Sequence, residues 1–229
     1  MISHARNNQL LSDLTCHART GFRCCGTSLP QLSSGPLGSS KRHSMALKKL
    51  PYKRLQSLIG IHLSTKEDLP TQKAIDQLLP AKKRGYLNKN DLVAICRWKS
   101  PRAIKHIKRN REETIIGITK EAFKSRSERK KLALLTQLHG VSVPMASSIL
   151  MLTNPQRYGV IDIRVWQLLY AMGSVNKNAS GIRFDFNQWY RFLVLIRYFA
   201  DKYDVKARDI ERTLFYVHSL YQKGLLYRK

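Results

Sequence analysis

The 229-residue chain is strongly basic: 41 Lys and Arg residues stand against 15 Asp and Glu residues, which gives a formal net charge of +26 at pH 7 and an isoelectric point near 10.3. Apolar residues make up 43% of the chain, enough to bury a core, and this excludes wholesale disorder. The best apolar run, residues 192–196, is closed by Arg197, so we expect no membrane span. The charge predicts an acidic partner, which composition leaves open as DNA, RNA or an anionic membrane surface.

Residues 1–45 differ in composition from the rest. They contain eight serines and five basic residues but only one acid, Asp13. This composition predicts a disordered Ser-rich basic tail. We expect an intracellular protein of the cytoplasm, the nucleoid or the nucleus, and the composition of the tail leaves import into mitochondria open as an alternative. The cysteines form no C-x-x-C pair, so we expect neither a disulfide framework nor a metal site; they are Cys16, Cys24, Cys25 and Cys96.

From residue 46 to residue 229 the apolar residues recur with a helical period, and no stretch alternates strictly enough for a strand. We therefore predict an all-α domain. Its first predicted helices are residues 91–97, capped by Asn88 or Asn90, and residues 102–109, opened by Ser100 and Pro101. Further helices are predicted from Glu112 toward Phe123 and from Ser127 to Leu138.

Two apolar stripes near the C-terminus predict helices that build the core. The members of the two stripes are Trp189, Phe192, Leu193, Ile196, Phe199 and Tyr203, then Ile210, Leu214, Val217 and Tyr221. Because these aromatic residues fall on the periodic face, we expect them to pack in the core and not to stack on bases.

The positive charge is concentrated between Arg97 and Lys131, where 13 basic residues stand against four acids. Lys99 and Arg102 belong to this stretch. It favours contact with phosphate groups, while a solvated helix face is the alternative.

A helix, a tight turn and a second helix are predicted around Gly140. Gly140 permits the turn, and Pro144 fits the opening turn of the second helix. Such a turn leaves backbone N–H groups unpaired that can bind a DNA phosphate, here those of Gly140, Val141, Ser142 and Val143. An ordinary helical connection with a glycine C-cap is the alternative.

Eighteen residues after Pro144, Asp162 opens another predicted helix in the segment Ile-Asp-Ile-Arg-Val. Together with Leu-His-Gly-Val-Ser at residues 138–142, this segment resembles the helix-hairpin-helix DNA glycosylase superfamily, whose hairpin reads L-P-G-V-G and whose catalytic segment reads V-D-T-H-V at the same spacing. The resemblance covers about residues 132–172, with the helix-hairpin-helix motif at about residues 132–152. It implies a two-lobed helical bundle.

The resemblance also implies a chemistry. Asp162 would lie beside the sugar of a flipped-out nucleotide, where a carboxylate stabilises developing positive charge or activates water. Arg164 would contact DNA, and Tyr158 and Trp166 are further candidates for the cleft, although Trp166 also suits the core. As alternatives, Asp162 would serve only as a helix N-cap, the role we expect for Asp185.

The sequence departs from the family pattern at several positions. Ser142 replaces the second hairpin glycine, His139 replaces proline, and Arg164 replaces histidine. Pro144 stands where relatives that also cut the DNA strand carry a lysine, and the C-terminal half has no cysteine for an iron–sulfur cluster. We therefore expect no cofactor and a monofunctional enzyme that leaves an intact abasic site.

The function predicted from the sequence is base-excision repair by a monomeric DNA glycosylase that binds double-stranded DNA containing a damaged base. A noncatalytic helix-hairpin-helix DNA-binding protein is the alternative, and a protein that binds RNA or a membrane surface through charge alone is a third hypothesis.

Overall fold

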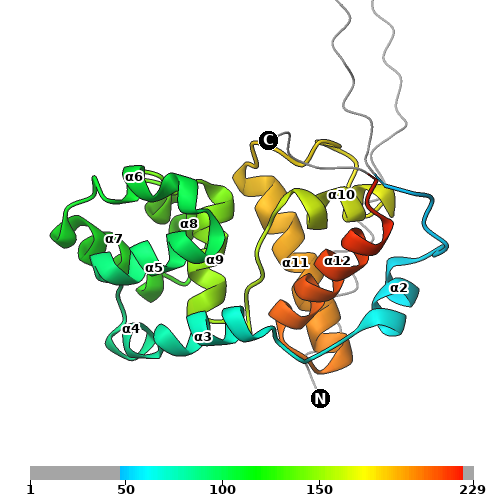
Figure 1. Cartoon of the computed structure of the whole chain (residues 1–229), viewed down its shortest axis with the longest axis horizontal. Coiled ribbons are helices and arrows are strands. Elements are labelled where there is room, and N and C mark those ends of the chain that lie inside the picture. The colour runs from blue at the N-terminus through cyan, green and yellow to red at the C-terminus, as the bar shows by residue number, and fades with distance from the viewer. Residues whose placement is uncertain (1–46, 224–229) are drawn as a thin grey trace, which may run out of the picture. The chain divides into compact units, whose positions relative to one another are not determined.

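The computed structural model describes residues 47–223, and these residues are mostly helical (Figure 1). Within them there is no strand, and a single antiparallel bridge joins Leu47 to Gln222. The all-α prediction is therefore confirmed for this part of the chain. The predicted tail at residues 1–45, with Cys16, Cys24 and Cys25, lies outside the described residues.

Although longer segments, residues 154–162 and 172–185, precede and follow the helix Ile163–Ala171 (α10), most of the helices follow one another with short connections. Their bounds are α2 Leu55–His62, α3 Leu69–Gln77, α4 Leu79–Arg84, α5 Lys89–Lys99, the 3-10 helix η1 Pro101–Ala103, α6 Ile104–Ile107, α7 Glu112–Lys124, α8 Glu128–Leu135, α9 Val143–Thr153, α10 Ile163–Ala171, α11 Phe186–Tyr203 and α12 Ala207–Tyr221.

Most predicted caps are present. Asn88 and Asp185 begin α5 and α11 with reciprocal capping boxes, and the Ser127 hydroxyl accepts a hydrogen bond from the Lys130 amide at the start of α8. Because each cap satisfies backbone N–H groups that a helix start leaves unpaired, polar residues at these positions fix where the helices begin.

Two predicted helix boundaries are wrong. The Ser100 side chain makes no capping bond, and in place of one helix to residue 109 the chain forms η1 and the short α6, which end at Ile107. Helix α8 ends at Leu135 and not at Leu138, because the amides of Gln137 and Leu138 bond to carbonyl groups three residues back. The chain is already tightening into the turn there.

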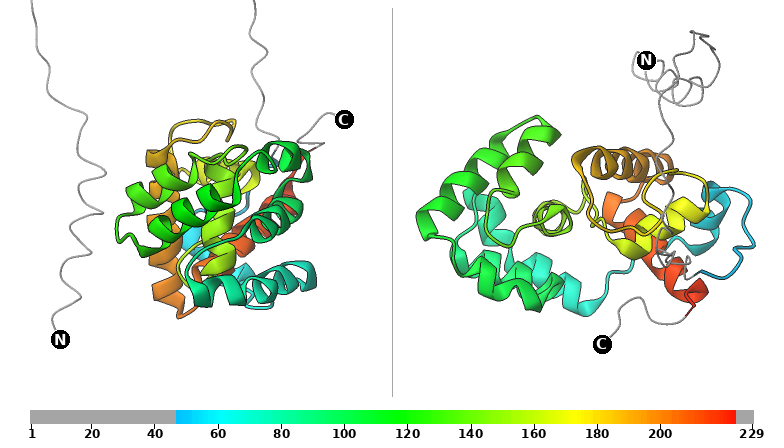
Figure 2. Two further views of the ribbon diagram at one scale, coloured as in Figure 1. Left: turned by 90° about the vertical axis from the view of Figure 1, so that its left-hand side faces the viewer. Right: turned by 90° about the horizontal axis from the view of Figure 1, so that it is seen from above.

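Helix α12 packs against α2, α10 and α11, while α5 packs against α3, α6 and α9 (Figures 1 and 2). Both predicted core stripes face inward: Trp189, Phe192 and Ile196 are fully buried in α11, as are Ile210 and Leu214 in α12. Within residues 47–223, no helix combines the length and apolarity needed to cross a bilayer.

Candidate nucleic-acid interface

The turn between α8 and α9 has the geometry expected from its sequence. Gly140 adopts a left-handed φ of +80°, and Pro144 lies in the first turn of α9. A side chain at Gly140 would place its Cβ 2.9 Å from the Cβ of His106 and 3.2 Å from the amide nitrogen of Ile107. Glycine is therefore required here both for its backbone conformation and for the close approach of α6.

Several backbone amides of this turn are available for a ligand. The amides of Gly140, Ser142 and Val143 have no hydrogen-bond partner among residues 47–223, and the Ser142 side chain makes no capping bond. Gly140 and Ser142 are exposed. The amide of Val141 differs from the prediction, since it donates to the Leu138 carbonyl, which removes Val141 from the available donors.

Asn110, a buried residue in the connection after α6, holds the turn between α8 and α9 in place through its side chain. Its amide nitrogen donates to the His139 carbonyl at 3.0 Å and to the Ile107 carbonyl at 2.8 Å, and its Oδ1 accepts from the His139 amide at 2.8 Å. The turn is thus held in one conformation by a side chain that satisfies both backbone groups of His139.

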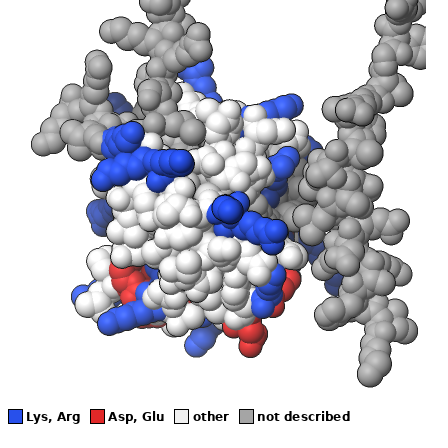
Figure 3. Space-filling model, turned by 90° about the vertical axis from the view of Figure 1, so that its right-hand side faces the viewer, with Lys and Arg blue, Asp and Glu red and all other residues white. Residues whose placement is uncertain are grey.

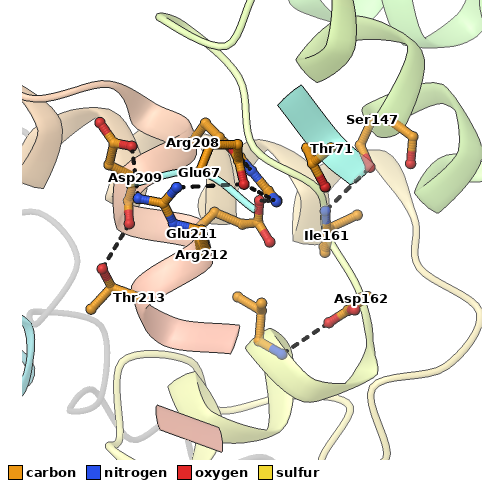
Figure 4. Close-up of polar contacts among 12 residues, drawn as sticks. Glu67, Thr71, Ser147, Ile161, Asp162, Arg208, Asp209, Glu211, Arg212 and Thr213 are labelled. Atoms are coloured by element: carbon orange, nitrogen blue, oxygen red, sulfur yellow. Dashed lines mark hydrogen bonds and ion pairs between the residues drawn. The ribbon is translucent and has the colours of Figure 1, made fainter. Parts of the chain in front are cut away.

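The segment before Asp162 is tied to the same helix pair. Ser147 of α9 donates to the Pro144 carbonyl at 2.8 Å and accepts from the Ile161 amide at 3.2 Å (Figure 4). Ser147 thereby connects the first turn of α9 to the residue immediately before Asp162.

Asp162 is the N-cap of α10, and its Oδ1 accepts from the Val165 amide at 3.0 Å. Its other carboxylate oxygen, Oδ2, lies 3.7 Å from the Nζ atom of Lys99, at the end of α5. The Asp162 side chain is 19% exposed and that of Lys99 is 20% exposed. Oδ1 of Asp162 therefore caps the helix, while Oδ2 faces the partly exposed ammonium group of Lys99.

A second carboxylate, Glu211 of α12, lies close behind the segment that leads to Asp162. Gly159 leaves the room for it, since a Cβ there would come within 2.7 Å of the Glu211 Cβ. Burial raises the pKa of Glu211, Arg208 lowers it, and the charge of Asp162 raises it again.

Glu211 belongs to a buried ion-pair network. Arg208 joins Glu211 to Glu67, which precedes α3, and Arg212 pairs with Asp209 at 3.1 Å and with Glu67 at 3.4 Å (Figure 4). The network links α12 to the connection between α2 and α3, so it fixes the face of α12 against which Gly159 and Val160 pack.

The two other residues predicted to contact DNA, Arg102 and Arg164, differ in how they are placed. Arg102 is exposed in η1, one turn beyond Lys99. Arg164 lies in the first turn of α10, and its guanidinium stacks over the Phe215 ring at 4.9 Å, so a large part of its surface packs on α12.

The two aromatic candidates both direct their polar atoms to partners other than Asp162. Trp166 is 1% exposed and donates through Nε1 to the Asn178 carbonyl at 2.9 Å, which confirms its core role. The expectation for Tyr158 is wrong, because this buried residue turns toward α8 and donates its hydroxyl to Glu128 at 3.0 Å.

Sequence patterns gave no signal for Asn110, Ser147 or Glu211. Asn110 and Ser147 bond to His139 and Ile161, and Glu211 packs against Gly159, all distant along the chain. An isolated Asn, Ser or Glu on a helix or at its end is most simply a solvated or capping residue. Within residues 47–223, no group of three or more His, Cys, Asp or Glu side chains is arranged to hold a metal ion.

Comparison with known proteins adds no family to this geometry. No family model matches the chain, and neither the curated proteins nor the solved structures give a match.

Proposed function

We propose that this protein binds duplex DNA and hydrolyses the N-glycosidic bond of a flipped-out damaged base, with Asp162 as the catalytic residue. The proposal includes a two-lobed arrangement of the helices and a helix-hairpin-helix motif formed by α8, the turn at Gly140 and α9. The proposal rests on the partly exposed carboxylate of Asp162. Its position is fixed because the preceding residue, Ile161, is hydrogen-bonded to Ser147 of α9 and because Asp162 itself caps α10.

The hairpin would bind the DNA backbone. The unpaired amides of Gly140, Ser142 and Val143 lie at the N-terminus of an 11-residue helix, where the helix dipole favours an anion. Because these donors are backbone groups, they bind phosphate without regard to base sequence. This is the contact expected of a protein that must search along DNA for a rare lesion.

Asp162 would act on the sugar. Cleavage of the bond between base and sugar develops positive charge on the ring, and a carboxylate near that ring stabilises the charge or activates the water that adds to it. The cap bond to Val165 holds Oδ1 in place, so Oδ2 is the atom that faces the substrate. In the free protein Lys99 neutralises this oxygen, and on binding its ammonium would move to a DNA phosphate.

The reaction would end at an intact abasic site. Pro144 offers no amine, Lys130 is paired with Glu121 at 2.7 Å, and Lys131 lines a cavity at the other end of α9. Lys99 is the lysine that forms an ion pair with Asp162. As a charged ammonium in an ion pair it is a poor nucleophile, so we expect water to attack the sugar.

One observation favours the noncatalytic alternative. Both Asp162 oxygens already have partners, the Val165 amide and the Lys99 ammonium, and an aspartate with only a structural role would have the same contacts. In that case the hairpin would still bind DNA, but no base would be released.

The test is incubation of the protein with a panel of DNA duplexes that each carry one modified base, with matched unmodified duplexes as controls. We expect release of the free base and accumulation of abasic sites from at least one duplex. Duplex binding without release from any of them would establish the noncatalytic alternative. Equal affinity for RNA or for anionic lipid vesicles would contradict DNA recognition itself.

A further inference from the structure

A strongly basic cavity lies at the C-terminal end of α9, away from the hairpin at the N-terminus of this helix. Its volume is about 570 Å³, within the range of small-molecule sites. Helix α9 has 11 residues, which separates its two ends by about 16 Å. The cavity is lined by residues of α4, α7, α8 and α9, of the connection between α7 and α8, and of the turn that follows α9.

The lining contains seven cations and one carboxylate. Arg84 is already paired with Asp91, which leaves six cations that make no ion pair among residues 47–223: Lys82, Lys120, Lys124, Arg126, Lys131 and Arg157. The carboxylate, Glu128, is engaged by Arg197 at 2.8 Å and by the Tyr158 hydroxyl at 3.0 Å. This single carboxylate is outnumbered by the six cations that make no ion pair.

Helix dipoles do not balance this charge. The C-termini of α4, α7 and α9 point toward the cavity, and basic residues in a last helical turn commonly offset the partial negative charge of such ends. Each terminus carries only about half a charge, so three of them offset about 1.5 of the six. The N-terminus of α8, at Glu128, adds partial positive charge to the same place.

Burial and the charges around the cavity together set the pKa of Lys131. Burial lowers the pKa of Lys131; Glu128 acts in the opposite direction, and the charges of Arg157 and Arg197 add to the lowering. By contrast, on the face drawn in Figure 3 the basic side chains lie in separate groups, some of them beside acidic side chains. The cavity instead gathers its cations around one concave space, where a compact anion can contact several of them at once.

We propose that this cavity binds a small ligand that carries several phosphate groups, of the size of a nucleotide. Clustered phosphates satisfy several cations simultaneously, as neither a single carboxylate nor a chloride ion can. Phe123 and Leu150 supply apolar surface beside the cations, which suits a ligand with a nonphosphate part. The site is separate from the hairpin and Asp162, so it does not depend on the proposed DNA chemistry.

The experiment measures binding of inorganic tripolyphosphate by calorimetry to the full-length protein at about 0.15 M salt, where general surface attraction is largely screened. Orthophosphate, a nucleoside triphosphate and a short single-stranded DNA are further arms. We expect tripolyphosphate to bind at least about 10-fold more tightly than orthophosphate, because it reaches more cations. Tighter binding of the nucleoside triphosphate than of tripolyphosphate would assign the apolar surface to the nonphosphate part.

The double variant Lys124→Gln with Arg126→Gln removes two cavity cations that are exposed, so the fold should persist. Its matched control, Lys105→Gln with Lys108→Gln, removes the same charge from exposed positions that do not line the cavity. We expect the cavity variant to weaken tripolyphosphate binding at least about 10-fold and the control to change it less than about 3-fold. A thermal melt of each variant checks folding.

Three results would overturn the proposal. One is the absence of tripolyphosphate binding by the wild-type protein. Another is an equal loss of affinity in the two double variants, which would show attraction by total charge alone. The third is single-stranded DNA that binds more tightly than tripolyphosphate and loses affinity in the cavity variant, which would make the cavity part of a nucleic-acid surface.

Discussion

At the scale of single residues, Asp162 combines a structural and a proposed chemical role through its two oxygens. Oδ1 caps α10, whereas Oδ2 faces Lys99 at 3.7 Å. The cap role could be predicted from the sequence, because aspartate before a helical apolar pattern is a common N-cap. The ion pair with Lys99 could not, since 63 residues separate the two positions and only the packed helices bring them together.

Lys99→Gln distinguishes a phosphate contact from a nucleophile. If Lys99 binds phosphate, the substitution should weaken duplex affinity about 3- to 10-fold and reduce the slope of log affinity against log salt by about 1, while base release persists. Binding at several salt concentrations and a release assay measure both effects. A wild-type adduct trapped by borohydride on lesion-containing DNA, and absent from Lys99→Gln, would instead make Lys99 the nucleophile.

His218 is a buried titratable group whose protonation opposes folding. Its Nε2 atom lies 3.2 Å from the Gln167 side-chain oxygen. Burial and, to a smaller extent, the charge of Arg164 lower its pKa to about 4, while the charge of Asp162 opposes the shift. Because the unfolded chain binds this proton near pH 6.5, the contribution of His218 to stability is full above pH 6.5 and is lost as pH falls toward 4.

The stability difference between wild type and His218→Gln should therefore depend on pH. Relative to the variant, the free energy of unfolding of the wild type should fall by about 1 to 2 kcal/mol between pH 6.5 and pH 4, allowing for solvent screening. Denaturant titrations of both proteins across this range measure the difference. A difference that stays constant, or that rises toward low pH, would show that His218 is not held neutral by the fold.

At the scale of elements, the helices were more predictable than their contacts. Caps at Asn88, Ser127 and Asp185 could be predicted because each acts on backbone within three residues. The sequence predicts the end of α8 three residues too late, because residues 136–138 fit a helical pattern but already belong to the turn. Asn110 could not be predicted as a support of the hairpin, since its partner His139 lies 29 residues away.

The hairpin can be tested with two glycines that share a backbone conformation. Gly140 and Gly173 have φ values of +80° and +68°, but only at Gly140 would a Cβ meet a neighbour within 4 Å. Alanine at either position costs about 1 kcal/mol of backbone strain. Gly140→Ala should in addition displace the turn from α6 and weaken duplex binding about 10-fold, with the salt slope unchanged because no charge is removed.

The comparison is made by measuring duplex affinity and thermal stability for both variants. Gly173 follows α10, and the Gly173→Ala variant should bind duplex DNA with wild-type affinity. Wild-type affinity in a folded Gly140→Ala protein would mean that the turn is not the DNA contact.

At the scale of the whole molecule, the net charge of +26 predicted an anionic partner, and the structure divides part of that charge between distinct places. Lys99 and Arg102 lie near the turn into α6, whereas Lys124, Arg126 and Lys131 line the cavity. The sequence presented all of these residues as one basic stretch. It could not show the division, because the reversals of direction between α6, α7 and α8 decide which side each lysine faces.

The salt dependence of duplex affinity should report how many DNA phosphates the protein contacts. If the hairpin and its basic neighbours contact about 4 to 6 phosphates, log affinity should fall against log salt with a slope of roughly −4 to −5. Fluorescence anisotropy of a labelled duplex between about 50 and 200 mM salt gives the slope. A flat response would exclude the electrostatic contact on which the proposed DNA binding depends.

The most direct test of the proposed function compares Asp162→Asn with Asp185→Asn in single-turnover base release from a lesion-containing duplex. Both aspartates are N-caps that accept a hydrogen bond from the backbone amide three residues on, at 3.0 and 2.8 Å, and asparagine keeps most of that capping ability. Only Asp162 is proposed to face the cationic sugar. We predict that Asp162→Asn lowers the rate of base release at least about 100-fold with duplex binding retained, while Asp185→Asn stays within about 2-fold of wild type. Base release at the wild-type rate by a folded Asp162→Asn protein would contradict the account and leave Asp162 as a helix cap alone.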